Sequence, residues 1–348
     1  MGTVTTIEQL ERVVGRRPLG ARMKTLPSLD AHCELLLGHS PFAVLGWADR
    51  EGRARATAVG GAPGFAAVDH PNALRLTLPP EEGMTSVDPA VGVGMLFLIP
   101  GLGETLRING TARVEDGELF LTIREAFVHC AKAVLRSSLW DPAAAEPTSG
   151  EAPESGDGPL ADPAIGEWLA RAPFLVSTSW DAEGQGDASP KGDPPGFVRL
   201  HGSHLLVPDR PGNRRTDTFH NLIAQPKVAV LVFVPGETRV LEVSGHASLT
   251  TEASLLETMA VQRKVPKIAM RLAVERARLA ESHALAASRL WDPSLHWPAE
   301  EQPDMSAVFI EHVKKNRARG AAATAVRTLA SKRLMKWSLA QDYEKNRY

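Results

Sequence analysis

The chain is poor in cysteine, and this excludes two common kinds of small protein module. Only Cys33 and Cys130 are present among its 348 residues. Two isolated cysteines supply neither the framework of a disulfide-rich secreted domain nor the clustered ligands of a zinc knuckle. We therefore expect no disulfide framework and no bound metal.

Long apolar runs and an excess of charge of one sign are also missing. No apolar stretch approaches the length of a membrane span, and the opening MGTVTTIEQLERVVGRR has no signal-peptide core. The formal net charge of -2 argues against a chain that binds nucleic acid as a whole. We expect a cytoplasmic enzyme or binding protein that associates with neither nucleic acid nor a membrane.

The length and one biased segment predict two main domains. Residues 143–160 are rich in Pro, Gly, Ser and acidic residues, which is typical of a linker that spans roughly 25 Å as a flexible coil. We expect one domain over residues 1–142, the linker over 143–160, a second domain over 161–303 and a helical basic tail over 304–348.

The two domains repeat each other in sequence, which indicates an internal duplication. SRLWDP at 288–293 answers SSLWDP at 137–142. Three longer blocks align in the same order: SPKGDPPGF (189–197) on TAVGGAPGF (57–65), VPDRPGNRR (207–215) on LPPEEGMTS (78–86), and VLVFVPGETRVLEVSG (230–245) on MLFLIPGLGETLRING (95–110).

Each copy reads as about six short strands with a flanking helix, so the expected fold is mainly β with helices, as two small β-barrels in tandem. In the first copy, residues 7–39 read as helical and residues 126–137 as the flanking helix, which Pro142 stops. The second copy carries an additional helical insertion near residues 254–264. Strands are expected at 73–78, 91–99, 105–114 and 119–123.

Residues 187–222 combine basic side chains with glycine and proline turns around a predicted hairpin. Lys and Arg supply charge-assisted donors, and glycine allows the backbone to approach a ligand closely. Such turns can hold a phosphate or another compact anion, although basic turns on β-proteins are commonly just solvated.

The two copies differ in where they keep these charges. The second copy has Lys191, Arg210, Asn213 and Arg214 where the first has Val59, Glu81, Met84 and Thr85. The first copy has Arg107, His129, Lys132 and Arg136 where the second has Glu242, Ala280, His283 and Ala287. On the predicted helix the last three of the first copy's residues share one face. This complementarity predicts one composite site built from both halves; random drift after duplication is the alternative.

These motifs resemble the pyridoxamine 5′-phosphate oxidase-like superfamily of FMN-binding split β-barrels. More narrowly, the chain is similar to a bacterial group of probable FMN-dependent enzymes. The motifs that carry the resemblance stand here as SPKGDPPGF at 189–197, PDRPGNR at 208–214, LFLIPGLGETLRING at 96–110 and FVHCAKAVLRSSLWDP at 127–142.

The resemblance implies a cofactor and roles for the residues. Members of the superfamily hold FMN at a homodimer interface, which the two barrels of this chain would imitate as an intrachain pseudo-dimer. Residues implied to bind FMN are Ser189, Lys191, Gly192, Arg210, Asn213 and Arg214, with the three cations on the phosphate. Residues implied to lie near the isoalloxazine or the substrate are Arg107, Lys132 and Arg136, with His129 as a proton donor or a structural histidine.

The function expected from this resemblance is an FMN-dependent oxidoreductase for a small organic substrate, with NAD(P)H or dioxygen as the second reactant. One alternative is a haem protein with His129, His220 or His283 as axial ligand; another is a catalytically silent flavin-binding protein. F420 in place of FMN stays open, as do the occupancy of the first copy's degenerate pocket and the choice between a monomeric pseudo-dimer and a homodimer.

The tail is basic: Lys and Arg occur ten times between residues 310 and 348, against three acidic residues. A docked amphipathic helix with a solvated cationic face is the simpler interpretation, and an arm that binds RNA or a membrane is the alternative.

Overall fold

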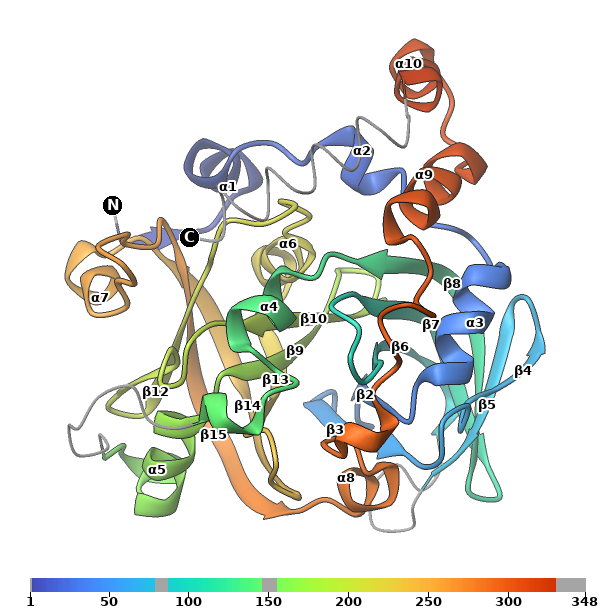
Figure 1. The fold of residues 1–348 in the computed structure, drawn as a ribbon. Coiled ribbons are helices and arrows are strands. Elements are labelled where there is room, and N and C mark those ends of the chain that lie inside the picture. The colour runs from blue at the N-terminus through green and yellow to red at the C-terminus, as the bar shows by residue number, and fades with distance from the viewer. Residues whose placement is uncertain (1, 79–86, 146–154, 330–348) are drawn as a thin grey trace.

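The computed structural model describes residues 2–78, 87–145 and 155–329, and it confirms a mainly β fold with helices. Two antiparallel sheets lie side by side, and the helices are at their edges and over one side (Figure 1). The described part of the chain has no helix both long and apolar enough to cross a membrane.

The first sheet is formed by residues 42–129. Its strands follow the order β3-β2-β6-β7-β8-β5-β4, so β5 and β6 are consecutive in the chain but lie apart in the sheet: β5 pairs with β4 and β8, and β6 pairs with β2 and β7. The strands are β2 (Phe42–Ala48), β3 (Ala54–Gly60), β4 (Ala67–His70), β5 (Ala73–Thr77), β6 (Val87–Leu98), β7 (Thr105–Glu115) and β8 (Glu118–His129).

The second sheet has the same strand order, β10-β9-β13-β14-β15-β12-β11, and the short strand β1 (Thr3–Val4) adds to β14. Its strands are β9 (Phe174–Trp180), β10 (Gly186–Gly192), β11 (Arg199–His201), β12 (His204–Pro208), β13 (Lys227–Phe233), β14 (Arg239–Thr250) and β15 (Ala269–Glu281).

Fine details of the two sheets also correspond. The pairing of β7 with β8 shifts between Asn109 and Gly110, where Arg124 of β8 is the extra residue, and the pairing of β14 with β15 shifts at the aligned Ser244/Gly245, where Glu275 of β15 is the extra residue. In each LWDP motif the indole N–H donates to a backbone carbonyl, Trp140 to Leu102 at 2.7 Å and Trp291 to the aligned Glu237 at 2.8 Å. These correspondences support the interpretation of a duplicated unit.

Two helix predictions are wrong in extent. The predicted helix at 126–137 is helical only over α4 (Lys132–Ser137), because residues 126–129 continue β8 and pair with the start of β7. The helical reading of residues 7–39 holds for three separate helices, α1 (Ile7–Val14), α2 (Leu19–Arg22) and α3 (Ala31–His39). Gly15, at φ 83°, and Pro18 end and restart the helix between the first two.

The other helices are short and lie at barrel edges. The predicted insertion is helical only over α7 (Ala253–Glu257). The rest are α5 (Pro163–Arg171), α6 (Asp217–Ala224), α8 (His283–Ser288), α9 (Met305–Lys315) and α10 (Ala321–Leu329), with 3-10 turns at Pro142–Ala145, Gly158–Leu160 and Pro293–Leu295.

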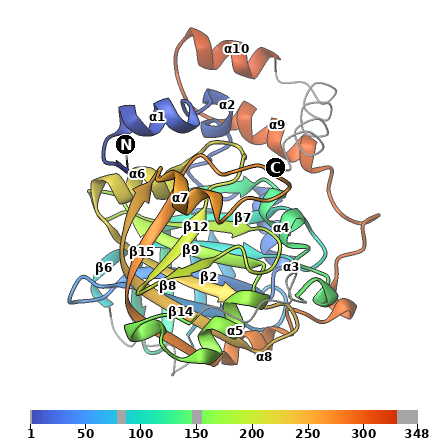
Figure 2. The same ribbon diagram turned by 90° about the vertical axis from the view of Figure 1, so that its left-hand side faces the viewer.

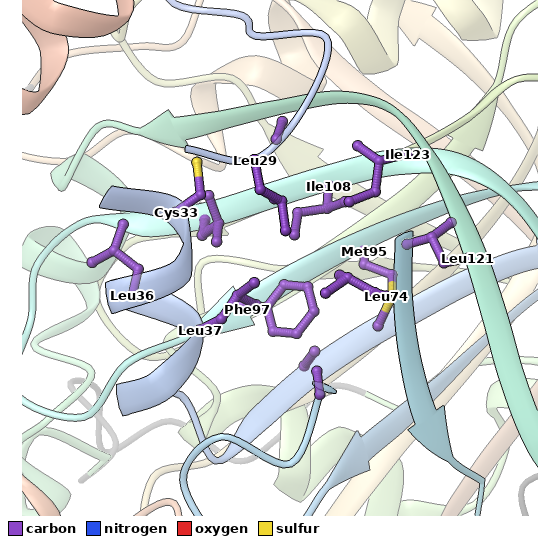
Figure 3. Packing of buried hydrophobic residues seen from close by; sticks show 14 of the residues in the cluster. Leu29, Cys33, Leu36, Leu37, Leu74, Met95, Phe97, Ile108, Leu121 and Ile123 are labelled. Atoms are coloured by element: carbon purple, nitrogen blue, oxygen red, sulfur yellow. The ribbon is translucent and has the colours of Figure 1, made fainter. Parts of the chain in front are cut away.

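Each barrel has its own apolar core, and a third cluster joins them. In the first barrel, the buried face of α3 packs on Met95, Phe97 and Ile108 of the sheet (Figure 3). The joining cluster contains Phe42 and Phe233, whose rings meet edge to face at 5.8 Å. Because this contact is apolar and fully buried, the barrels form a single packed body.

Both ends of the described chain pack on the barrel that is more distant in sequence. β1 pairs with β14, and Leu10 of α1 is in the core of the second barrel. Val308 and Phe309 of α9 enter the core of the first barrel. Helix α9 of the tail is therefore docked on the first barrel. Residues 330–348, to which the alternative of an arm that binds RNA or a membrane also applies, lie outside the described residues. Figure 2 shows α1, α2, α9 and α10 together on one side of the sheets.

The bulge between β14 and β15, where Gly245 of β14 lies at the register shift, gives a test of the fold. A Cβ atom on Gly245 would be 2.0 Å from the carbonyl oxygen of Ala273, so Gly245→Ala requires the backbone to shift. We expect a loss of about 1–3 kcal/mol in the free energy of unfolding, measured in urea. Gly38→Ala on α3 is the matched control, because nothing lies within 4 Å of its Cβ position. It should stabilise the chain by about 0.5–1 kcal/mol; equal effects would contradict the assigned bulge.

Candidate functional site

A cavity of about 710 Å³ lies where the two barrels meet. The first barrel contributes the end of β8 and helix α4; the second contributes β10, the turn after β12 and the start of α6. All ten residues that the sequence analysis singled out line this one cavity: Arg107, His129, Lys132, Arg136, Ser189, Lys191, Gly192, Arg210, Asn213 and Arg214.

The first barrel's residues reach the cavity in a different way from that predicted. His129 is the last residue of β8, whereas Lys132 and Arg136 are on α4, so the three do not share a helix face. The chain turns between β8 and α4 at Cys130, which also lines the cavity. Lys132 and Arg136 are both buried, and the Arg136 guanidinium donates to the carbonyl of Pro211 in the second barrel.

Helix α4 lies directly on strand β10, and a glycine makes this possible. A Cβ atom on Gly192 would be 2.0 Å from the carbonyl oxygen of Ala133. The glycine of the SPKGDPPGF motif therefore allows α4 of one barrel to contact the strand of the other. α8 also packs on the aligned Gly60 of β3: a Cβ atom there would be 3.2 Å from Ser288 and 3.3 Å from the Ala284 carbonyl oxygen, with the Pro41 carbonyl oxygen closer still at 2.6 Å.

The turn at residues 208–216 leads into α6 and contributes side chains to the cavity wall. Arg214 and Thr216 both have left-handed backbones, with φ 53° and 52°. The Asn213 side-chain oxygen accepts from the backbone N–H of Arg215 at 3.0 Å, which fixes the turn. Arg214 is exposed and lines the cavity. Two polar atoms here, Asn213 Nδ2 and Thr218 Oγ1, are buried and have no hydrogen-bond partner among the described residues.

The charges of Lys191 and Arg210 differ in how closely they are paired with acidic side chains. The Lys191 ammonium is 3.9 Å from an oxygen of Asp209 and 4.9 Å from the centre of the Phe219 ring. Burial lowers the pKa of Lys191, and Asp209 acts in the opposite sense. The Arg210 guanidinium instead donates to Asp193 at 2.5 Å and to the carbonyl of Met259 at 2.7 Å. Arg210 therefore connects the cavity wall to the segment that follows α7.

Arg107 forms the floor of the cavity. Its side chain is 1% exposed, and Nη2 donates to Asp187 and to Ser189 Oγ at 2.5 Å each. Asn109 adds a donor to the same carboxylate at 3.2 Å. Arg107 and Asn109 are on β7 of the first barrel, whereas Asp187 and Ser189 are on β10 of the second.

Asp217 at the start of α6 forms ion pairs with three arginines. Arg17 approaches it at 3.2 Å, Arg215 at 2.8 Å and Arg107 at 3.5 Å. Burial would raise the pKa of Asp217, but the arginines outweigh burial and hold that pKa below its usual value. Arg215 also donates to the Ala21 carbonyl and, at 2.9 Å, to Thr25 Oγ1. These contacts fix the N-terminal segment against the cavity, where Val14 is part of the wall.

Sequence reasoning missed Asp187, Asp217 and the N-terminal segment as parts of the site. The acidic residues gave no signal because the partners that tie them to the first barrel and to the N-terminal segment, Arg107 and Arg17, are far away in the sequence. Arg215 lies in the basic stretch that the sequence analysis emphasised, but its role is to hold the N-terminal segment.

The lining of the cavity favours an anionic ligand. Among the described residues, nine Lys and Arg line it, against three Asp. The nine are Arg107, Lys132, Arg136, Lys191, Arg210, Arg214, Arg215, Lys264 and Lys267; the three are Asp193, Asp209 and Asp217.

The equivalent region of the first barrel is built differently. Residues 87–94, which follow the block aligned on 207–215, already belong to β6, whereas the second barrel has α6 at this point. Among the residues of the first barrel that the structure describes, there is therefore no counterpart of α6. The counterparts Glu81, Met84 and Thr85 lie outside the described residues, and Val59 is buried in the first barrel's core.

Of the three candidate haem ligands, only His129 lines the cavity. Its Nδ1 is buried without a hydrogen-bond partner among the described residues. His220 is on α6 and bonds the Thr216 carbonyl through Nδ1 at 2.9 Å. His283 is exposed at the start of α8.

A comparison with models of protein families shows which family the second barrel is similar to. Residues 161–291 match the family model described as pyridoxamine 5′-phosphate oxidase. Residues 161–291 are thus similar to the pyridoxamine 5′-phosphate oxidase family. The match confirms the resemblance for the half that supplies Lys191 and the basic turn. No curated protein matches the sequence of the chain.

About a third of the chain is similar to several solved structures. Some of these are relatives of pyridoxamine 5′-phosphate oxidase, and others carry different names. A putative pyridoxamine 5′-phosphate oxidase from Lactobacillus delbrueckii is 19% identical, with a TM-score of 0.26, over 32% of this chain and 88% of that protein. An F420 reductase is 15% identical, with a TM-score of 0.26, over 32% and 94%. HutZ from Vibrio cholerae, described as a haem storage protein, is 14% identical, with a TM-score of 0.27, over 34% and 93%. At these identities and TM-scores the likenesses carry no statement about cofactor or reaction.

His129 should make the stability of the chain depend on pH. Burial, and then Arg107, hold the pKa of His129 well below its usual value, so the folded chain keeps this imidazole neutral. The unfolded chain takes up a proton below about pH 6.5, and the folded chain then loses about 1.4 kcal/mol per further pH unit. In His129→Gln the stability should fall less between pH 7 and pH 5, as measured by urea unfolding. His283→Gln is the exposed control, and a wild-type slope in His129→Gln would contradict this reading.

Proposed function

We propose that the chain is an FMN-dependent oxidoreductase that acts on a small organic substrate, with one flavin site built from both barrels. One observation carries the proposal: candidate residues from the two halves, far apart in sequence, line a single cavity of about 710 Å³. This volume is within the range of roughly 300–1,000 Å³ that is typical of small-molecule sites.

The residues present fit an FMN phosphate at the basic turn. Arg214 and Lys191 supply charge, and α6 begins beside them, where its N-terminal N–H groups favour an anion. The buried donor of Asn213 and the hydroxyl of Thr218 lack partners among the described residues, and a phosphate offers acceptors for both. Arg210 supports this turn from behind, since Asp193 and the Met259 carbonyl hold its guanidinium.

FMN, when bound, supplies the capacity to accept and donate a hydride or electrons. The first barrel's cations would hold the reactive part: Lys132 and Arg136 bring positive charge to the cavity wall, which stabilises negative charge on a bound ring or substrate. Phe197 and Phe219 provide apolar lining that excludes water. Arg107 acts as a positioning residue, because Asp187 and Ser189 hold its guanidinium below the cavity.

His129 has two possible uses at this wall. A neutral imidazole can donate or accept a proton at the cavity, and it is also the form that binds a haem iron. The haem alternative therefore rests on His129 alone among the three histidines considered. An absorption spectrum of the purified chain separates the two: a flavin band near 450 nm supports the proposal, and a Soret band that disappears in His129→Ala contradicts it.

The phosphate assignment predicts which charges matter for FMN. Lys191→Ala and Arg214→Ala should each weaken FMN binding roughly ten- to hundredfold, because each removes a charge-assisted hydrogen bond to a dianion. Arg53→Ala is the matched control, since Arg53 is on the β2–β3 turn and bonds Asp49 and Glu51 outside the cavity. FMN fluorescence quenching on titration measures the dissociation constants. Unchanged affinity in both site variants, with stability matched to the wild type, would refute the assignment.

The absence of an α6 counterpart among the described residues of the first barrel predicts the stoichiometry. We expect one FMN per chain, and we expect that complex to persist in a chain that sediments as a monomer. Calorimetric titration combined with sedimentation velocity tests both points. Two equivalent sites per chain, or flavin bound only in a chain dimer, would show that the composite site is assigned wrongly.

A further inference from the structure

Where the barrels meet, aligned positions carry opposite charges. The alignment and the strand registers pair Arg107 with Glu242, Glu125 with Arg276, and Asp187 with Arg55. At each of the three pairs, one barrel has a base where the other has an acid. The interface thus contains two equivalent charge groups of inverted sign, group A (Arg107, Glu125, Asp187) and group B (Glu242, Arg276, Arg55).

Group A is a direct contact between barrels. Arg107 of β7 donates to Asp187 of β10 at 2.5 Å, and Asn109 donates both to Asp187 at 3.2 Å and to Glu125 at 2.9 Å. The first barrel supplies the base and the second supplies the acid.

Group B is the same arrangement with the signs exchanged. Arg55 of β3, Glu242 of β14 and Arg276 of β15 line a single small cavity of about 20 Å³. Burial raises the pKa of Glu242, and Arg278, Arg276 and Arg55 act in the opposite sense, so Arg55 of the first barrel stabilises this carboxylate electrostatically. Here the first barrel again supplies the base and the second again supplies the acid.

Beside group A, the backbones of the two barrels lie so close together that water could not enter to screen a repulsive pair of charges. A Cβ atom on Gly94 of β6 would be 2.4 Å from the Asp187 carbonyl carbon, and one on Gly186 of β10 would be 2.4 Å from that of Val93. Strands β6 and β10 therefore cross in backbone contact, without space for water to screen a wrong charge.

We propose that these inverted charges make each barrel's inner face specific for the other barrel and reject a second copy of itself. A pairing of two first barrels would bring Arg107 against Arg55, and a pairing of two second barrels would bring Glu242 against Asp187. Each of these contacts sets a residue of the buried group A against one of the partly buried group B, and like charges brought together there discriminate against the wrong pairing. The partner that this face fits is thus the other half of the chain, and the specificity does not depend on the bound cofactor.

The first test uses group B in the full chain, because group B lies outside the candidate site. Arg55→Glu and Glu242→Arg should each lower the urea midpoint of unfolding. The chain with both substitutions should be more stable than the sum of the two losses predicts, because the cross-barrel attraction returns. Arg113→Glu combined with Glu242→Arg is the control, since Arg113 is an exposed residue on β7, and its losses should add. Additive losses for the Arg55 pair would overturn the proposal.

The second test measures partner choice. In the chain with both substitutions, a pairing of two first barrels would bring Arg107 against an acid at position 55, and a pairing of two second barrels would bring Asp187 against a base at position 242. These two contacts between like barrels therefore become attractive as well, whereas Glu125 and Arg276 keep their signs. Sedimentation velocity at low salt should show a larger fraction of chain dimers than in the wild type at equal concentration. Equal dimer fractions in two folded proteins would overturn the proposal, and so would failure of the doubly substituted chain to fold where the single variants fold. If the charge-reversed single variants themselves unfold, the same double-mutant cycle is measured with Arg55→Gln and Glu242→Gln. Non-additive losses of stability would then support the proposal, and additive losses would overturn it.

Discussion

The ion pair between Arg107 and Asp187 is the contact on which the site depends. Each residue comes from a different barrel, and substitution of either one by an apolar residue would leave the other as a buried, uncompensated charge. Removing one partner of a buried pair costs about 3–5 kcal/mol, whereas the intact pair adds little to stability beyond an apolar equivalent. The pair therefore acts mainly on geometry: it allows one relative placement of β7 and β10, and that placement creates the cavity between them.

The sequence contained enough to predict the two barrels and the composite arrangement, because both follow from repeated local patterns. It was misleading at residues 126–129. The spacing of His129, Lys132 and Arg136 fits a helix face, but a strand end followed by a short helix brings the same three residues to one cavity. Only the pairing of Phe127 with Arg107 on β7 settles the strand, and a pairing across a bulged hairpin has no local signature.

The candidate site was predictable in its cations and not in its acids. A cluster of Lys and Arg between glycines is visible in a sequence, whereas Asp187 and Asp217 acquire their roles from Arg107 and Arg17 in distant segments. The same reason explains Arg210: its motif suggested a ligand for phosphate, and the structure pairs it with Asp193 and with the segment after α7. Whether a base faces a ligand or an internal acid is decided by tertiary contacts.

The route of the N-terminal segment has a consequence for how the protein matures. Gly2 bonds the side chain of Thr250, 248 residues away, and Thr25 bonds Arg215. A ribosome exposes these first residues long before their partners exist, and contacts of such long sequence separation form late because chain closure must precede them. The wall that Val14 contributes to the cavity is therefore among the last parts to be completed. During synthesis the nascent first barrel exists without a finished site, and binding competence appears only when translation has passed the end of the second sheet.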